Sequence, residues 1–338
     1  MREVLAEQAA AFGERPFAIF DDRTLSYQDL YAESLRIAEG LRRLGVGKGD
    51  PVMLASRNRS EYVTSFFATA WLGAIAVPVN VALKGESLAH LFATTRPRTA
   101  LIEKEFLARL RDALGDENTL ERIIIIGDTD DISEDSSVTA FDDLLASDPI
   151  EPVPIERGDP WIIMFTSGTT GVAKGVTMPH QQISSTAWDA VYDMQIDEDS
   201  LFYTFYPLYH LNGLIFGPMA TLIAGAQTVV RSSFPRESTL EELRKYRATH
   251  WCSLPFLSRA MLAAPPKDDD ATIDLRCIMT FGLLPDEVQA MQTRFGCRLV
   301  GGYGMTEAGM VCRLQSERPE TSGLVSDRSQ LRIVDGDG

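Results

Sequence analysis

The sequence predicts an α/β protein with two doubly wound, mostly parallel sheets. Short apolar runs typical of buried strands alternate with segments of helical spacing along most of the chain. This alternation favours parallel strands whose connecting helices cover both faces of a sheet. With 338 residues, the chain can bury a large core and divide into more than one unit. Its 45% hydrophobic and 24% charged residues are ordinary values for a globular protein, which supports this class.

The first half of the chain begins its alternation with a helix start signal. Residues 26–29, Ser-Tyr-Gln-Asp, resemble a capping box, and Gly45 is a natural stop for the helix that follows. Strands are expected at 52–55, 75–79, 99–102 and 123–126, and helices at 60–71, 86–95 and 104–114. The acidic, Ser-rich segment 128–138 is predicted to be a solvated loop.

A proline-rich connector separates this half from the second. Residues 147–160 contain four prolines, so we expect one subdomain at 1–150 and another at 151–312. In the second subdomain, strands are expected at 161–165, 175–178, 202–206, 228–230, 250–254, 277–281 and 299–300. Helices are expected at 180–194, 211–224, 240–246, 256–262 and 285–295. Pro285 suits the first position of the last of these helices.

Composition excludes several functional classes. The net charge of −16 argues against a general nucleic-acid or anionic-membrane binder, although a local positive site for a nucleotide is compatible with it. Residues 62–83 and 201–230 lack charge, but internal Pro and Gly indicate buried helix–strand pairs rather than membrane spans. The N-terminus has no signal-peptide pattern, and the four scattered cysteines are typical of reduced core thiols, so we expect a cytoplasmic protein.

The most informative stretch is 161–180, in which an apolar strand leads into a polar, glycine-containing loop. Thr166, Ser167, Thr169 and Thr170 offer hydroxyls, while Gly168 and Gly171 let the backbone turn and approach a ligand. Lys174 brings a positive charge to the same place. Such a loop suits phosphate oxygens, since each charge-assisted hydrogen bond contributes about 1.5–3 kcal/mol. A Ser/Thr-rich surface turn is the alternative interpretation.

A second motif, Tyr303-Gly304-Met305-Thr306-Glu307, follows the last apolar run of the subdomain. The Tyr303 ring can stack on a planar base, and the Thr306 hydroxyl can bind a phosphate oxygen. Glu307 is a hard oxygen ligand of the kind that Mg²⁺ prefers, in company with phosphates. A strand end without chemistry is the alternative interpretation.

Together these motifs resemble the signatures of the AMP-forming adenylating enzymes, which include acyl-CoA synthetases, luciferases and peptide-synthetase adenylation domains. The first matches TSGTTG-x-x-KG, with Ala173 where the family usually has proline, and the second matches YG-x-TE. Residues 245–249 and 294–296 further resemble the carnitine/crotonobetaine-CoA ligase branch. The resemblance covers essentially the whole chain and implies the N-terminal domain fold of acyl-CoA synthetases, with residues 313–338 opening a third, β-rich subdomain through a strand and turn at 331–338.

The resemblance also implies roles for individual residues. Lys174 and the loop residues Thr166, Ser167, Gly168, Thr169, Thr170 and Gly171 would hold the triphosphate, and Thr169 and Glu307 would serve Mg²⁺. Thr306 would hold the α-phosphate, and the adenosine would lie against Gly282, Gly302, Tyr303, Gly304 and Met305. His210, Leu211 and Gly304 would border the acyl group, although a lone His in an apolar setting is usually a satisfied core residue. The expected catalytic set is Thr166, Lys174, His210, Thr306 and Glu307.

The implied activity is that of an AMP-forming acid–CoA ligase that uses ATP, Mg²⁺ and coenzyme A on a small carboxylic acid, either carnitine or crotonobetaine or a fatty acid. The alternatives are an adenylation domain that loads a carrier protein and a non-catalytic nucleotide or acyl-adenylate binding module. The small C-terminal lid domain of the family, with its catalytic lysine, is expected to lie outside these 338 residues. A homodimer is expected, and nucleic acid and integral membrane segments are not.

Overall fold

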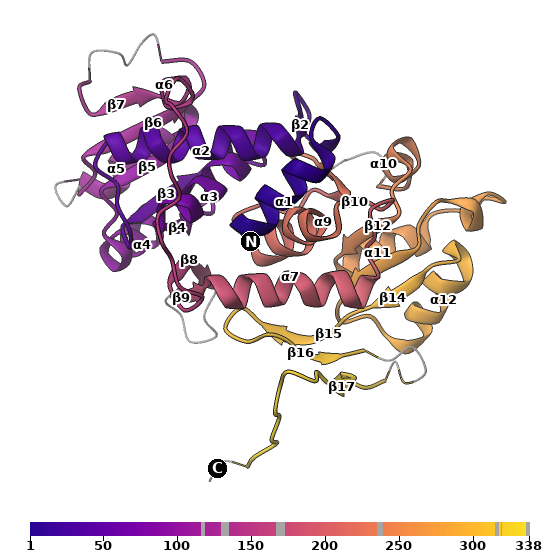
Figure 1. Ribbon diagram of the computed structural model, residues 1–338. Helices are drawn as coiled ribbons and strands as arrows, with labels where there is room; N and C mark the ends of the chain where they lie inside the picture. Colours follow the sequence, from indigo (N-terminus) through magenta and orange to yellow (C-terminus); the bar gives the residue numbers. More distant parts are fainter. Residues whose placement is uncertain are drawn as a thin grey trace.

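The computed structural model describes residues 1–115, 119–129, 135–166, 173–234, 239–314, 318 and 320–335. Within these residues it contains two large sheets, each mostly parallel, and one small antiparallel sheet (Figure 1). This confirms the predicted α/β class with two parallel-rich sheets and a third, β-rich part.

The first large sheet has the strand order β7-β6-β5-β3-β4-β8-β9. Its strands are β7 (Val138–Ala140), β6 (Arg122–Ile126), β5 (Thr99–Glu103), β3 (Pro51–Ala55), β4 (Ile75–Pro78), β8 (Pro160–Thr166) and β9 (Lys174–Pro179). Neighbouring strands are parallel except β8 and β9, which form an antiparallel hairpin at the edge. The inner strands β3, β4 and β5 are buried on both faces of the sheet, and they consist of near-continuous apolar runs for that reason.

The second large sheet has the order β14-β13-β12-β10-β11-β1-β2. Its strands are β14 (Arg298–Val300), β13 (Cys277–Thr280), β12 (His250–Ser253), β10 (Leu201–Thr204), β11 (Gln227–Val230), β1 (Pro16–Ile19) and β2 (Thr24–Ser26). Only β1 and β2 pair antiparallel. The sheets are not two consecutive blocks of sequence, since residues 16–26 belong to the second and 160–179 to the first. The expected division at residue 150 stays a prediction about domain limits.

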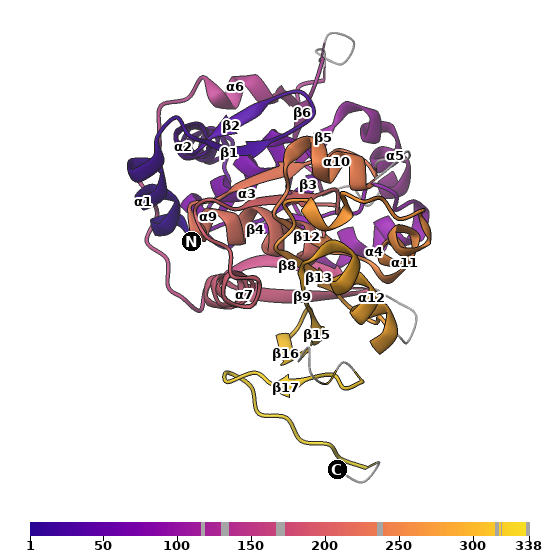
Figure 2. The same cartoon turned by 90° about the vertical axis from the view of Figure 1, so that its right-hand side faces the viewer.

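The third sheet is antiparallel and consists of β15 (Gly302–Met305), β16 (Gly309–Arg313) and β17 (Leu324–Val325). It lies below α7 in Figures 1 and 2, and the chain leaves it toward the C-terminus. Of the strand and turn expected from resemblance at 331–338, residues 331–335 are exposed and form no strand, and residues 336–338 lie outside the described residues.

Helices cover the large sheets and fill the space between them. They are α1 (Arg2–Phe12), α2 (Tyr27–Arg43), α3 (Ser60–Leu72), α4 (Gly85–Thr95), α5 (Lys104–Leu114), α6 (Phe141–Leu145), α7 (His180–Met194), α8 (Leu211–Leu214), α9 (Ala220–Ala224), α10 (Thr239–Tyr246), α11 (Pro255–Ala263) and α12 (Pro285–Phe295). The largest apolar cluster contains residues of α2, α3, α7 and α9 together with strands of both large sheets. Two further clusters bury α4 and α5 against the first sheet and α10, α11 and α12 against the second.

Local sequence signals account for several helix limits. The capping box is confirmed, since the Ser26 hydroxyl accepts a hydrogen bond from the Asp29 N–H and the Asp29 carboxylate accepts one from the Ser26 N–H. The helix expected over 211–224 instead comprises α8, a π-helical turn at Ile215–Met219 and α9. Pro218 lies inside this π turn and lacks the N–H that a regular α-helix would need there.

The two charge-free stretches are confirmed as buried helix–strand pairs, formed by α3 with β4 and by α8–α9 with the neighbouring strands β10 and β11. Within the described residues, no helix is long and apolar enough to cross a membrane. Cys252, Cys277, Cys297 and Cys312 are all buried and unbridged, which confirms the prediction of core thiols.

A buried histidine links β12 to the end of α7. The side chain of His250 is fully buried, with Nδ1 2.8 Å from the Thr249 hydroxyl and Nε2 3.1 Å from the Met194 carbonyl oxygen. Burial lowers the pKa of His250 to about 4. In the unfolded chain the ordinary value is about 6.5, so the unfolded state binds the proton first as the pH falls.

We therefore expect the free energy of unfolding to decrease as the pH is lowered from 7 to 5. His250→Gln should weaken this dependence, because an amide can keep the hydrogen bond to Met194 without titrating. Urea denaturation at several pH values measures the effect. A variant with the same pH slope as the parent would contradict the assignment of His250 as a buried neutral imidazole. Part of the slope should remain, since burial also lowers the pKa of His180 to about 4.

Candidate functional site

A cleft opens where the carboxyl ends of the first sheet's strands meet the second and third sheets. Its volume is about 720 Å³. Its lining comprises Pro78, Asn80, Leu83, Leu91, Met164, Phe165, Thr166, Ala173, Lys174, Tyr209, His210, Met305, Thr306 and Glu307. Crevices outside the carboxyl ends of parallel strands are the usual ligand sites of α/β proteins. All five residues that the sequence predicts to be catalytic line this cleft.

A second, smaller cavity of about 290 Å³ shares His210, Met305 and Thr306 with the cleft. It is lined by His210, Leu211, Asn212, Phe216, Phe281, Gly302, Tyr303, Gly304, Met305, Thr306, Gly309 and Met310. These lining residues include several large apolar side chains and neither a carboxylate nor an ammonium group. The three residues expected to border an acyl group, His210, Leu211 and Gly304, therefore meet in one cavity.

The β8–β9 hairpin brings the first motif to the cleft. Thr166 and Lys174 are paired across the hairpin, so the ends of the intervening segment are held side by side. Ser167, Gly168, Thr169, Thr170 and Gly171 lie outside the described residues. Lys174 is exposed at the cleft, and no carboxylate in the described part of the chain lies within ion-pair distance of its ammonium group.

His90 supports the returning end of this hairpin, and sequence reasoning missed it. Its Nε2 donates a hydrogen bond to the Ala173 carbonyl oxygen at 2.9 Å, and its ring packs edge-on against Phe165 with centroids 6.4 Å apart. His90 lies in α4, more than eighty positions earlier in the sequence. No short motif surrounds it, so only the folded arrangement identifies it.

The second motif forms β15 and the turn after it. This backbone requires glycine, because a Cβ on Gly304 would lie 2.5 Å from the Gly309 carbonyl oxygen. A Cβ on Gly302 would lie 1.9 Å from the Cys312 carbonyl oxygen, and its φ of 149° also favours glycine. Tyr303 is 47% exposed and lines the smaller cavity, while the Glu307 side chain is exposed at the cleft.

Gln182 of α7 holds the turn that presents Thr306 and Glu307. Its Nε2 donates to the carbonyl oxygens of Glu307, at 2.9 Å, and of Thr306, at 3.3 Å. The two bonds orient this stretch of backbone and leave its side chains for the cleft. Sequence reasoning missed Gln182 as well, because the contact joins residues more than 120 positions apart.

His210 lies on both cavities and caps the short helix α8. Its Nδ1 accepts a hydrogen bond from the Asn212 N–H at 3.3 Å. The residue surface of His210 is exposed, and partial desolvation of its ring lowers the pKa of His210 below its ordinary value, so the neutral imidazole predominates at pH 7. Because Nδ1 is the acceptor, the proton of the neutral ring lies on Nε2, which can donate to an oxygen of a ligand.

Gly282 lies in the turn after β13 with a φ of 71°, next to Phe281 of the smaller cavity, but Gly282 itself lines neither cavity.

The oxygen ligands of the cleft are compatible with Mg²⁺ that arrives with a phosphate ligand. The described residues contain no group of three or more His, Cys, Asp or Glu side chains that could hold a metal alone. Glu307 offers one carboxylate to the cleft, and Mg²⁺ commonly binds through one or two carboxylates plus phosphate oxygens and waters.

The fold defines an α/β protein with a cleft, the candidate ligand site, at the carboxyl ends of its parallel strands. The model of the AMP-binding enzyme family matches residues 5–338, and the chain belongs to that family. The chain is 29% identical over 317 residues to a crotonobetaine/carnitine–CoA ligase of Salmonella typhi. The identity to the same enzyme of Citrobacter koseri is also 29%. Each alignment covers 91% of this chain and 61% of the relative, so the chain spans about three fifths of these curated relatives.

Solved structures share the fold. The anthranilate CoA ligase AuaEII in complex with anthranoyl-AMP matches with a TM-score of 0.89 and 24% identity, over 100% of this chain and 66% of that one. The inhibitor-bound N-terminal domain of FACL13 from Mycobacterium tuberculosis matches with a TM-score of 0.81 and 22% identity, over 94% of this chain and 79% of that one. These likenesses establish the architecture of both large sheets.

Gln182→Ala should loosen the turn at Thr306 and Glu307, because two carbonyl groups lose their side-chain donor. We expect faster amide hydrogen exchange over residues 303–309 and little change in the strands of the two large sheets. Hydrogen–deuterium exchange with mass spectrometry measures this. Gln181→Ala, at an exposed neighbouring position of the same helix, is the matched control. Equal exchange in parent and Gln182→Ala would show that Gln182 does not hold the turn.

Proposed function

We propose that this chain carries the carboxylate-activating site of an AMP-forming acid–CoA ligase. The observation that supports the proposal is the cleft, where Lys174 and Thr166 of the hairpin face His210, Thr306 and Glu307. In the first step, a carboxylate oxygen attacks the α-phosphorus of ATP, an acyl-AMP forms and pyrophosphate leaves. In the second, the thiol of coenzyme A attacks the acyl carbon, a thioester forms and AMP leaves.

The residues of the cleft contribute mainly charge and position. Lys174 and the 166–171 segment bind the β- and γ-phosphates, and the Thr306 hydroxyl binds the α-phosphate. Tyr303 packs on the adenine, and the Nε2–H of His210 orients the acid. Mg²⁺, held by Glu307 with Thr169 and the phosphates, would neutralise negative charge on the transferring group. Preorganised donors and charges of this kind stabilise the transition state without a protein nucleophile.

The acid binds in the smaller cavity. A volume of about 290 Å³ suits a small acid better than a long acyl chain. Phe216 and Phe281 line this cavity, and aromatic faces attract quaternary ammonium groups through cation–π contact. With the named activity of the curated relatives, this supports a trimethylammonium acid of the carnitine and crotonobetaine type as the substrate and coenzyme A as the acceptor. We also propose the cytoplasm as the location, because the four cysteines are buried and unbridged.

Mass spectrometry of acyl-AMP tests the activation step directly. The chain is incubated with ATP, Mg²⁺ and carnitine, crotonobetaine or fatty acids of several lengths. We expect one strong adenylate, from a trimethylammonium acid. An adenylate from long fatty acids alone would contradict the substrate assignment. The absence of both acyl-AMP and pyrophosphate with every acid, from this chain and from a chain extended by the lid domain, would contradict the activation step.

Lys174→Ala should raise the ATP concentration needed for half-maximal adenylate formation by about tenfold, equivalent to about 1.4 kcal/mol of lost charge interaction. The matched control is Lys267→Ala, which removes an exposed lysine of the loop after α11. Steady-state kinetics against ATP measure the change. Unchanged ATP dependence would remove Lys174 from the phosphate site.

Glu307→Ala should lower ATP-dependent turnover by more than about tenfold, because the cleft loses its carboxylate ligand for Mg²⁺. Raising the Mg²⁺ concentration should recover part of this loss. Glu151→Ala, in the exposed connector, is the control. If turnover of the Glu307 variant stays near that of the parent at every Mg²⁺ concentration, the carboxylate has another role.

A further inference from the structure

A single buried amide joins the first large sheet to the segment that carries His210. Asn58 follows β3, in the turn before α3, and its residue surface is 6% exposed. Its Nδ2 donates to the carbonyl oxygens of Tyr206, at 2.9 Å, and of Arg231, at 2.8 Å. Its Oδ1 accepts from the Leu208 N–H at 2.8 Å. One side chain thus engages backbone groups that follow two neighbouring strands of the second sheet, β10 and β11.

The segment after β10 transmits this anchoring to His210. Leu208 is 1% exposed, and the His210 N–H donates to the Pro207 carbonyl oxygen at 3.0 Å. Two bonds from Asn58, to Tyr206 and Leu208, bracket Pro207. The backbone that leads into the His210 turn is therefore fixed on both sides of Pro207, and the ring lies only two residues beyond the second bond.

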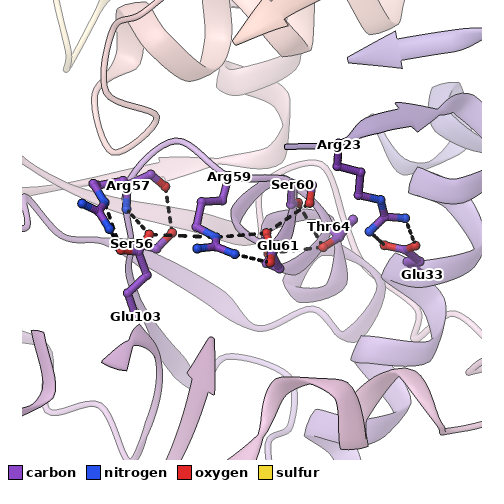
Figure 3. Close-up of polar contacts among 9 residues, drawn as sticks. All are labelled: Arg23, Glu33, Ser56, Arg57, Arg59, Ser60, Glu61, Thr64 and Glu103. Carbon is purple, nitrogen blue, oxygen red and sulfur yellow. Dashed lines mark hydrogen bonds and ion pairs between the residues drawn. The ribbon is translucent and has the colours of Figure 1, made fainter. Parts of the chain in front are cut away.

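The turn that carries Asn58 is itself held rigidly. Glu103, at the end of β5, is 3% exposed, and its carboxylate accepts hydrogen bonds from the Arg57 N–H and the Arg57 Nε, both at 3.1 Å. Figure 3 shows Glu103 against Arg57, with Arg59 beside them and paired in turn with Glu61. A carboxylate that binds both the main chain and the side chain of Arg57 fixes the direction in which the next residue, Asn58, points.

We propose that Asn58 is a positioning residue that sets the place of His210 between the two cavities, acting from the first sheet through the backbone of residues 206–208. The proposal rests on the function proposed above, because it gives the position of His210 a purpose. No apolar residue could replace Asn58 without leaving two carbonyl groups and one N–H group without this partner. The amide has two donors and an acceptor on one planar group, which is the set that this junction uses.

Asn58→Ala and Asn58→Asp are the test variants, and Tyr27→Phe is the matched control. The Asp variant keeps the shape and the acceptor for Leu208 but replaces the donor nitrogen with oxygen. Tyr27 is also fully buried and donates from α2 to the Ala226 carbonyl oxygen at 2.5 Å, beside the second sheet but away from the cleft. Tyr27→Phe therefore reports the cost of losing a buried side chain to backbone bond elsewhere.

Histidine NMR gives a readout that needs no catalysis. The chain has four histidines, so substitution of each assigns its imidazole signals. In both Asn58 variants, we expect the His210 signals to shift and broaden while those of His90 and His250 stay in place. In Tyr27→Phe, all four should stay in place. His210 signals that match the parent in both Asn58 variants would overturn the proposal.

Kinetics and amide exchange complete the test. In the Asn58 variants, kcat for adenylate formation should fall on the order of 10- to 100-fold, as for a misplaced catalytic group, with little change in the KM for ATP. A parent without adenylate activity would contradict the proposed function, while the NMR result would still decide the positioning role.

If both variants fail to fold, hydrogen exchange of the Leu208 amide in the parent decides the positioning role. Slow exchange supports the hydrogen bond from Leu208 to Asn58, and fast exchange overturns the proposal.

Discussion

The packing of Trp161 is the constraint on which the site depends. This side chain is fully buried at the start of β8, stacked between Phe66 of α3, at 4.5 Å, and His180 of α7, at 4.7 Å. Its indole N–H also donates to the Thr69 hydroxyl at 3.1 Å. β8 leads into the hairpin with Thr166 and Lys174, and α7 carries Gln182, which holds the turn at Thr306 and Glu307. One aromatic stack thus sets the relative position of both motifs.

Close backbone approach is the second condition for the cleft. At β15 and β16 the strands approach so closely at Gly302 and Gly304 that any side chain would collide with a carbonyl oxygen of β16. Gly213, in α8, is similarly confined, since a Cβ there would lie 2.2 Å from the Pro207 carbonyl oxygen. The turn before His210 can therefore pack directly on the first turn of α8. Small residues at these points let the backbone, rather than long side chains, define the cavity walls.

Sequence reasoning succeeded where information is local and failed where it is not. The limits of α5, α7 and α12 follow from helical spacing and terminal residues, and the two motifs identify both edges of the cleft. β1 and β2 escaped notice because these short strands join a sheet whose other members lie some 200 residues later. His90, Gln182 and Asn58 act through contacts 83 to 173 positions away, which no local pattern encodes. The homodimer stays a prediction.

The arrangement of the cleft explains why buried polar contacts matter here. In the proposed reaction, the triphosphate lies against the first sheet and the acid against the second, so the reacting atoms meet only if the two sheets hold one relative position. Apolar burial supplies most of the attraction between them, but it is non-directional and tolerates small sliding motions. Hydrogen bonds weaken steeply with misalignment. A directional contact such as that of Asn58, which follows a strand of the first sheet, with the Tyr206 carbonyl oxygen beside the second sheet therefore selects one alignment among the many that the apolar core alone would permit.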